Sequence, residues 1–391
     1  MMDDINKNKR IALTGGAAAA EALKQIEPEV MPVYPITPQT PIIETYAKFQ
    51  ADGEVETEII QVESEHSAIS ASVGSSAAGA RTVTATSSQG LALMNEILYI
   101  ASGLRLPILM LVSARALSAP LNIHGDHSDV MDARDTGWIQ IFSENAQEVY
   151  DNTIIGMKLA EKVGLPVMVI MDGFNVSHSV ENLEILDKDA VKKFVGEYRP
   201  ENYLLNVDNP VTYGPLALPD YYFEFKADQE KAMEDSKKEY LRIVKDFEKL
   251  SGRKKNYFES YKLDDAEHAI VLAGATAGTA KDVVDKLRNK GEKVGILKIN
   301  LFRPFPREEI VAALKNVKNI AVMERAISSG TYSPFFQDIT SGFYALENKP
   351  ALQSCVYALG GRDIFAKDIE KVFEDLIQNK ISKEIKYIGI K

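Results

Sequence analysis

Short, continuously apolar runs alternate with helix-like segments along most of this chain. Residues 107–113 and 166–171 are two such runs, and the segments 91–102 and 148–163 that accompany them have helical composition. A strand that is apolar at every position is buried on both faces, which is typical of a parallel sheet covered by helices. The pattern therefore predicts an α/β fold.

The alternation is interrupted once, between about residues 175 and 265. Prolines cluster there with asparagine and tyrosine, which predicts irregular chain, and the charged segment 225–250 then predicts one long helix. Alternation resumes from His268. We therefore expect two α/β units, the first over 1–260 including this connector and a smaller one over 267–391.

The composition excludes several classes of function. Among 391 residues there is one cysteine, Cys355, so the chain forms no disulfide of its own and holds neither a thiolate zinc site nor an iron–sulfur cluster alone. We expect Cys355 to be an inert core residue. The net charge of -11 argues against nucleic acid, which requires a basic face. Since no apolar run approaches the roughly 20 residues that span a bilayer and no secretory signal is evident, we expect no membrane and a cytoplasmic location.

Three segments resemble phosphate-binding or metal-binding motifs but do not match them fully. The glycine turns at 13–16 and 274–278 lack the full dinucleotide or P-loop spacing, so each is interpreted as a tight strand–helix turn. His124 and His127 flank Gly-Asp but are not at helical i, i+4 spacing. We therefore expect a loop with capping side chains there and no metal site.

The segment 34–40 (Tyr-Pro-Ile-Thr-Pro-Gln-Thr) leaves a strand and enters a helix. Pro35 and Pro38 restrict the backbone around Thr37 and present its hydroxyl at the carboxyl end of a strand. Open α/β sheets bind their ligands at this edge. Local physics leaves a second interpretation equally open, a capped helix start with no ligand.

A pair of acids stands at the next predicted strand end. Glu63 and Glu65 lead into a helix of small residues, where few polar groups compete for a carboxyl. A carboxyl buried there would favour its neutral form and could donate a proton. In the alternative interpretation, both acids only complement the helix N-terminus. His66, which follows Glu65, is interpreted as a helix cap, although it could also tune that carboxyl.

These motifs occur together with others in a fixed order. The further segments are 84–90 (Thr-Ala-Thr-Ser-Ser-Gln-Gly), 113–115 (Ser-Ala-Arg), 123–129 (Ile-His-Gly-Asp-His-Ser-Asp), 133–138 (Ala-Arg-Asp-Thr-Gly-Trp) and 301–306 (Leu-Phe-Arg-Pro-Phe-Pro). In this order the chain closely resembles the alpha subunits of the multi-subunit pyruvate:ferredoxin oxidoreductases, within the 2-oxoacid:ferredoxin oxidoreductase family. The resemblance covers nearly the whole chain and is weakest across the connector.

The resemblance implies a division of labour among subunits. Residues 1–260 would form a thiamine diphosphate pyrimidine-binding domain, and 267–391 a transketolase C-terminal-like domain. The cofactor would lie between this chain and a diphosphate-binding beta subunit. Magnesium and the iron–sulfur clusters would lie on partner subunits, among them the ferredoxin-like gamma and delta subunits, with ferredoxin as electron carrier.

The resemblance also implies roles for single residues at the cofactor. Glu65 matches the motif glutamate whose carboxyl hydrogen-bonds N1′ of the aminopyrimidine and so activates thiazolium C2. Glu63 is the competing assignment. Pro35 and Ile36 would contact the same cofactor.

Two further residues match positions that contact the substrate. The Thr37 hydroxyl and the Arg115 guanidinium would bind the carboxylate of pyruvate, for which a planar fork is suited. The implied reaction converts pyruvate, coenzyme A and oxidised ferredoxin reversibly to acetyl-CoA, CO2 and reduced ferredoxin. The alternatives are the same chemistry on 2-oxoisovalerate or 2-oxoglutarate, and, outside enzymes, a doubly wound nucleotide-binding or scaffold protein.

Overall fold

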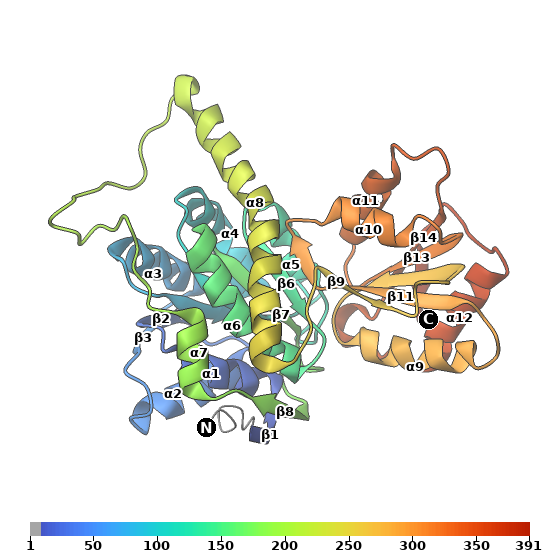
Figure 1. The fold of residues 1–391 in the computed structure, drawn as a ribbon, viewed down its shortest axis with the longest axis horizontal. Coiled ribbons are helices and arrows are strands. Elements are labelled where there is room, and N and C mark those ends of the chain that lie inside the picture. Colours follow the sequence, from blue (N-terminus) through green and yellow to red (C-terminus); the bar gives the residue numbers. More distant parts are fainter. Residues whose placement is uncertain (1–8) are drawn as a thin grey trace.

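The structure, a computed structural model, describes residues 9–391 and contains two main sheets with helices packed around them (Figure 1). The first sheet lies in the left and centre of the view, and the second lies in the orange-to-red part at the right. The predicted α/β class is confirmed. Within the described residues, no helix combines the length and the apolar character that a membrane crossing requires.

The first sheet has five strands in the order β12-β6-β7-β5-β4, of which four are parallel and β12 is antiparallel at one edge. The strands are β4 (Val83–Thr86), β5 (Leu109–Ala114), β6 (Ile139–Ser143), β7 (Val167–Asp172) and β12 (Leu301–Arg303). Every residue of β4, β5, β6 and β7 is buried. Alternate residues of β5 belong to two different hydrophobic clusters, so both faces of the sheet are covered.

Helices contribute to both of these clusters. The cluster with Leu109 and Leu111 includes residues of α1 (Gly15–Ile26), α6 (Ala146–Val163) and α8 (Pro219–Ser251). The cluster with Met110 and Val112 includes residues of α3 (Glu65–Ala78) and α4 (Ser88–Gly103). As the small residues of 68–79 predict, α3 packs closely beside α4.

A separate parallel pair, β2 (Val30–Val33) and β3 (Glu58–Gln61), lies next to this sheet. A parallel bridge between Val30 and Thr82 connects it to the start of β4. Helix α2 (Thr40–Ala51) follows β2, and α5 (Ser128–Asp132) follows the loop after β5. The carboxyl ends of β2, β3, β4 and β5 therefore point to one edge.

The connector contains more regular structure than its composition predicts. The long helix is confirmed as α8, but β8 (Val180–Ile185) and α7 (Lys188–Val195) also form where irregular chain is expected. Strand β8 pairs antiparallel with β1 (Lys9–Thr14), and its Leu183 and Ile185 are buried. The distant partner satisfies the backbone of β8, which no local signal reveals.

The second sheet has six strands in the order β15-β14-β13-β10-β11-β9. They are β9 (Phe258–Tyr261), β10 (His268–Leu272), β11 (Val294–Ile299), β13 (Asn319–Glu324), β14 (Ala351–Tyr357) and β15 (Lys386–Ile388). The accompanying helices are α9 (Thr276–Arg288), α10 (Arg307–Leu314), α11 (Pro334–Phe343) and α12 (Ala366–Ile377). Cys355 in β14 is buried, as expected, and burial raises the pKa of its thiol to about 12.

Two strands cross the predicted division between the units. Strand β9 comes from the connector yet pairs with β11 of the second sheet. Strand β12 follows β11 in sequence, yet pairs with β6 of the first sheet. The motif at 301–306 thus begins with an edge strand that fastens the second unit to the first. A division at 260–267 stays a prediction.

Candidate active site

The predicted site residues come from one edge of the first unit. Thr37 lies between β2 and α2, Glu65 begins α3 directly after β3, and Arg115 follows β5. Strands β2 and β3 are parallel to each other, and β4 and β5 are likewise parallel. Their carboxyl ends, where α/β sheets bind ligands, carry all three residues.

Arg115 and Thr37 are in direct contact. The Nη1 atom of Arg115 donates a hydrogen bond to the carbonyl oxygen of Thr37 at 2.9 Å, and its Nε donates to that of Asn122 at 3.0 Å. Arg115 is 6% exposed, so these two carbonyls fix the plane of a nearly buried guanidinium. Thr37 is exposed, and its hydroxyl makes no hydrogen bond with the described residues. The two predicted carboxylate-binding groups thus lie side by side.

Glu65 is a buried acid without a protein partner in the described chain. Its residue is 7% exposed, and the described residues 9–391 give its carboxyl no hydrogen bond and no ion pair. The cap of α3 is Ser64, whose Oγ accepts from the Ser67 N–H at 3.2 Å. The interpretation of His66 as the cap is therefore wrong. His66 Nε2 instead lies 3.9 Å from a carboxylate oxygen of Glu96.

The competing acid, Glu63, has a different environment. It is exposed, and its Oε1 accepts a hydrogen bond from the Ser67 hydroxyl at 2.5 Å. This hydrogen bond lowers the pKa of the Glu63 carboxyl. Of the two acids, Glu65 alone combines burial with an unpaired carboxyl.

Gly90 provides the space that the Glu65 carboxyl occupies. A Cβ at Gly90 would lie 2.8 Å from Glu65 Oε1 and 2.5 Å from Thr86 Oγ1, closer than real contacts allow. The hydroxyls of Thr86 and Ser87 are buried and have no hydrogen-bond partner in the described residues. Ser113 Oγ, one strand along, is also buried and unpaired. Buried polar groups are normally paired, so these atoms mark an edge prepared for an external partner.

Asp129, which the sequence analysis did not single out, connects the two halves of the site. Its Oδ2 accepts from the backbone N–H of Ser88 at 2.7 Å and from that of Arg115 at 3.0 Å. It is 1% exposed, and burial raises the pKa of its carboxyl to about 7. Ser88 has a φ of 49°, an uncommon value outside glycine, which the Asp129 bond stabilises. Asp129 thus fixes the position of the turn that carries Gly90 relative to the strand end that carries Arg115.

Comparison with known protein families decides the family. Residues 21–245 match the family described as pyruvate flavodoxin/ferredoxin oxidoreductase, thiamine diphosphate-binding. Residues 266–369 match pyruvate:ferredoxin oxidoreductase core domain II. The chain belongs to the pyruvate:ferredoxin oxidoreductase family.

Individual relatives agree with this membership. Pyruvate synthase subunit PorA of Thermotoga maritima is 54% identical over 386 residues, which are 98% of each chain. Among solved structures, the 2-oxoglutarate:ferredoxin oxidoreductase of Magnetococcus marinus superposes with a TM-score of 0.70 at 21% identity, covering 95% of this chain and 66% of that one. A split-gene transketolase superposes with a TM-score of 0.55 at 10% identity, covering 94% of this chain and 98% of that one. The last two likenesses concern the fold alone.

The residues at this edge fit the thiamine diphosphate that the family's description names. An aminopyrimidine presents a ring nitrogen and an amino group, which need a carboxyl and hydroxyls as partners. The unpaired carboxyl of Glu65 and the unpaired hydroxyls of Thr86 and Ser87 are such groups. Gly90 allows the Glu65 carboxyl to lie beside the Thr86 hydroxyl. In a member of the pyruvate:ferredoxin oxidoreductase family, this edge is the candidate cofactor site.

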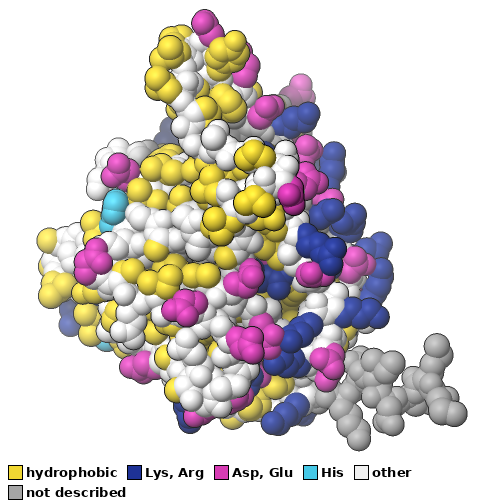
Figure 2. Space-filling view, turned by 90° about the vertical axis from the view of Figure 1, so that its left-hand side faces the viewer, with side chains coloured by type: hydrophobic (Ala, Val, Ile, Leu, Met, Phe, Trp, Pro, Cys, Tyr) yellow, Lys and Arg dark blue, Asp and Glu magenta, His cyan; other side chains and the backbone are white. Residues whose placement is uncertain are grey.

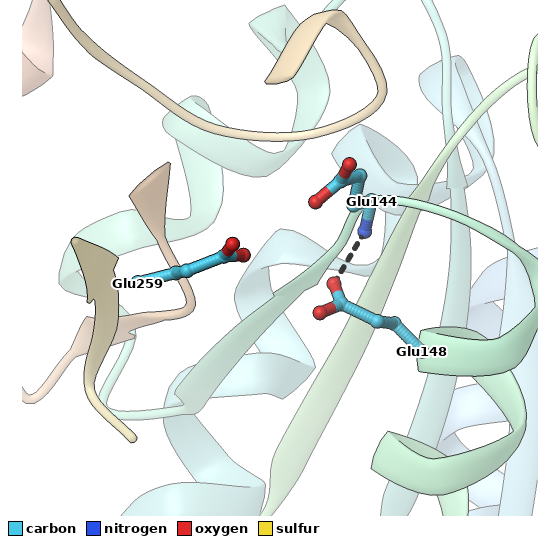
Figure 3. A group of neighbouring side chains, drawn as sticks. All are labelled: Glu144, Glu148 and Glu259. Carbon is cyan, nitrogen blue, oxygen red and sulfur yellow. Dashed lines mark hydrogen bonds between the residues drawn. The ribbon is translucent and has the colours of Figure 1, made fainter. Parts of the chain in front are cut away.

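A second group of acids resembles a metal site but is an ion cluster between the two units. The carboxylates of Glu144, Glu148 and Glu259 converge in Figure 3. Lys298 Nζ lies 2.7, 2.8 and 3.0 Å from their oxygens, respectively. Lys281 also pairs with Glu144 and Glu259, and Lys255 pairs with Glu148, so three ammonium groups balance the three carboxylates. Although burial opposes ionisation, the charges of Lys255 and Lys298 lower the pKa of Glu148 to about 2. These acids connect β6 and α6 to the second sheet and are not a metal centre.

The loop at 124–127 contacts several different partners. Asp126 accepts from both the N–H and the hydroxyl of Ser128, at 3.0 and 2.6 Å. His127 Nε2 lies 2.5 Å from Asp172 Oδ1, which Arg325 Nη1 approaches to 3.1 Å. The side chains of His127, Asp172 and Arg325 are all buried. The loop therefore helps to join the first unit to the second.

The glycine turns are tight strand–helix turns, as predicted. The N–H groups of Gly15 and Gly16 donate to the carbonyls of Val176 and Ser177 at 3.0 and 3.1 Å, so they do not face a phosphate. Gly274 has a φ of 77°, and a Cβ there would lie 2.7 Å from a carboxylate oxygen of Asp172. Close packing explains both sets of glycines.

Proposed function

We propose that this chain is the alpha subunit of a thiamine diphosphate-dependent pyruvate:ferredoxin oxidoreductase. In that role it takes part in the reversible conversion of pyruvate, coenzyme A and oxidised ferredoxin to acetyl-CoA, CO2 and reduced ferredoxin. The observation that carries the proposal is the buried, unpaired Glu65 at an edge that also presents Thr37 and Arg115. Identity of 54% over 98% of a pyruvate synthase subunit supports the substrate.

Glu65 is proposed to bind N1′ of the aminopyrimidine through its carboxyl. When bound, thiamine diphosphate would supply a nucleophilic carbon and an electron sink for the decarboxylation of a 2-oxoacid. Glu65 shares a proton with the ring nitrogen and so increases the basicity of the neighbouring amino group. Its burial limits the competition of water for this proton, and Gly90 leaves the Glu65 side chain the space that it occupies. Pro35 and Ile36, before Thr37, are proposed to contact the same ring.

Thr37 and Arg115 are proposed to bind the carboxylate of pyruvate. The Thr37 hydroxyl is free of protein partners in the described chain and donates to one carboxylate oxygen. Two carbonyls already orient Arg115, so little side-chain freedom is lost when its remaining N–H groups bind the carboxylate. Asp129 fixes the backbone of Arg115 relative to the turn beside Glu65, because it accepts a hydrogen bond from each.

The remaining parts of the catalytic apparatus are proposed to belong to other subunits. A beta subunit would bind the diphosphate and its magnesium ion, and ferredoxin-like gamma and delta subunits would carry the iron–sulfur clusters. The single, buried Cys355 supports this division, because a cluster needs about four thiolates. The cytoplasmic location stays a prediction, which fractionation of cells would test.

The test is activity of the assembled enzyme with one altered carboxyl. Glu65→Gln should reduce pyruvate- and coenzyme A-dependent reduction of ferredoxin by about 100-fold or more, because a positioned acid–base group contributes roughly that much. Glu63→Gln, which alters an exposed acid two residues away, is the matched control and should keep wild-type activity. Full activity of the Glu65→Gln enzyme would refute the assignment.

A further inference from the structure

The N-terminal part of α8 stands clear of the rest of the molecule. In Figure 1 this helix passes in front of the first sheet and continues upward beyond it. All ten residues from 219 to 228 are exposed, whereas Met233, Tyr240 and Phe247 later in the same helix are buried. At 1.5 Å per residue, this free part, which we call the arm, is about 15 Å long.

The arm carries four aromatic side chains that are exposed to solvent. Tyr221, Tyr222, Phe223 and Phe225 are 66%, 57%, 77% and 54% exposed. At about 100° per residue, the four rings cover roughly 200° of the helix circumference, twice the apolar arc of an ordinary surface helix. A flat partner surface covers only one side of a helix. An arc this wide needs a groove that encloses the helix.

The chain leading into the arm is apolar as well. The exposed hydrophobic residues there are Leu204, Leu205, Val207, Leu216 and Leu218. In Figure 2, yellow hydrophobic side chains cover much of the lobe that rises above the body. Contiguous exposed apolar surface of this kind is rare on monomeric proteins and marks binding surfaces.

The arm also has a charged side, which indicates the chemistry of its partner. Its acids, Asp220, Glu224 and Asp228, are four residues apart and form a stripe opposite the rings, and Lys226 is its single basic residue. The whole chain has a net charge of -11. Two arms packed against each other would bring acid against acid, and the net charge disfavours a second copy, so complementarity favours a different chain with lysine or arginine beside its groove.

The arm lies at the opposite end of α4 from the candidate active site. Ser88 begins α4 beside the Glu65 region, and Gly103 ends it about 24 Å away. The α8 residue next after the arm, Gln229, packs against Gly137, which lies just before the start of β6. The arm therefore offers a surface separate from the edge that would bind the cofactor.

We propose that the arm docks in an apolar groove, edged by basic residues, on another subunit of the same enzyme. The aromatic rings fill the groove and the acidic stripe pairs with its edge, a recognition of an amphipathic helix by a groove. This inference rests on the proposed function only in assuming a multi-subunit enzyme. It concerns a surface that the proposed catalytic groups do not use.

The first test is photo-crosslinking in the assembled enzyme. Phe223→p-benzoylphenylalanine should, on irradiation, join this chain to a different subunit. Lys245→p-benzoylphenylalanine, on the exposed side of the same helix beyond the arm, is the matched control and should not give that product. A product containing two copies of this chain, or no product at 223, would overturn the proposal.

The second test is assembly. Phe223→Asp with Phe225→Asp should reduce the amount of that subunit co-purifying with this chain roughly tenfold or more, as the loss of anchor residues does. Tyr344→Asp, at an aromatic residue that is 82% exposed elsewhere, is the control and should co-purify normally. Normal co-purification of the double variant would contradict the proposal. An enzyme inactive on pyruvate that still crosslinks at 223 would refute the proposed function alone.

Discussion

Two buried carboxylates at strand ends of the first unit have opposite surroundings. Asp172, at the end of β7, lies against His127 Nε2 at 2.5 Å, accepts from the Ala275 N–H at 2.7 Å and has Arg325 Nη1 at 3.1 Å. Glu65, after β3, has no such partner in the described chain. Yet the two residues are similarly buried, at 1% and 7% exposed.

The contrast separates a structural acid from one available to a ligand. Although burial opposes its ionisation, the charges of Arg325 and His127 hold the pKa of Asp172 well below its usual range. Asp172 is thereby fixed as the anion that joins the two units. A buried acid without partners, such as Glu65, costs stability, and such costs are typical of functional sites.

Glu324, at the end of β13, is a third buried carboxylate at a strand end. It is 2% exposed and accepts from the N–H groups of Phe335 and Phe336 at 2.7 and 3.0 Å. Burial outweighs these two bonds and raises the pKa of its carboxyl to about 8. Asp172 and Glu324 thus have opposite pKa shifts, because only Asp172 has cations within ion-pair distance.

The largest effect is expected at Asp172. Asp172→Asn leaves the buried Arg325 without its counter-ion and should lower the free energy of unfolding by about 3–5 kcal/mol. Urea denaturation can be followed by the fluorescence of Trp138, the chain's single tryptophan, which is buried in the first unit. An unchanged denaturation midpoint would contradict the structural role of Asp172.

A smaller effect is expected at Arg115, on substrate binding. Arg115→Lys keeps the charge but loses the planar fork, so the KM for pyruvate should rise about tenfold or more, with a smaller change in kcat. Steady-state kinetics of the assembled enzyme at saturating coenzyme A measures both constants. A change confined to kcat would argue against contact with the substrate carboxylate.

Glu324 should produce a pH dependence of stability. Its pKa in the folded chain, about 8, exceeds the ordinary value of 4.5, so between these values the folded state binds more protons than the unfolded state. The free energy of unfolding should therefore fall as pH rises from about 4.5 to about 8. In Glu324→Gln this contribution should vanish. Urea denaturation at several pH values in that range measures the free energy of unfolding of both proteins. If this free energy changed equally with pH in the wild type and in Glu324→Gln, Glu324 would not be the cause.

The smallest effect is the one that Glu65→Gln should have on the stability of the folded chain. Because the described protein gives this buried carboxyl no partner, Glu65→Gln should not lower the free energy of unfolding and should raise it by at most about 1 kcal/mol. Comparison with Asp172→Asn under identical urea conditions provides the contrast. A loss as large as that of Asp172→Asn would mean that Glu65 has a structural role after all.

Local patterns predicted two of the buried parallel strands of the first sheet and missed β6. The runs at 107–113 and 166–171 are apolar at nearly every position, and both became central strands, β5 and β7. Strand β8, helix α7 and the edge strand β12 were missed. Each of the two strands depends on a partner distant in sequence, β8 on β1 and β12 on β6, and such pairing leaves no local periodicity.

At the candidate site, residue types were predicted better than roles. The sequence placed two acids at a strand end, and the structure distinguishes them by the burial of Glu65 and by the hydrogen bond that Glu63 accepts from Ser67. It placed Arg115 and Thr37 near one ligand but could not reveal that they touch. Asp129 was overlooked, because its importance comes from backbone N–H groups on two separate segments.

Proton exchange at thiazolium C2 of thiamine diphosphate tests the central claim most directly. In the assembled enzyme, exchange into deuterated water can be followed by rapid quenching and NMR, without pyruvate or ferredoxin. If the Glu65 carboxyl activates the cofactor, Glu65→Gln should slow this exchange by about 100-fold or more, while Glu63→Gln leaves it unchanged. An unchanged exchange rate in Glu65→Gln, with the cofactor still bound, would contradict the account.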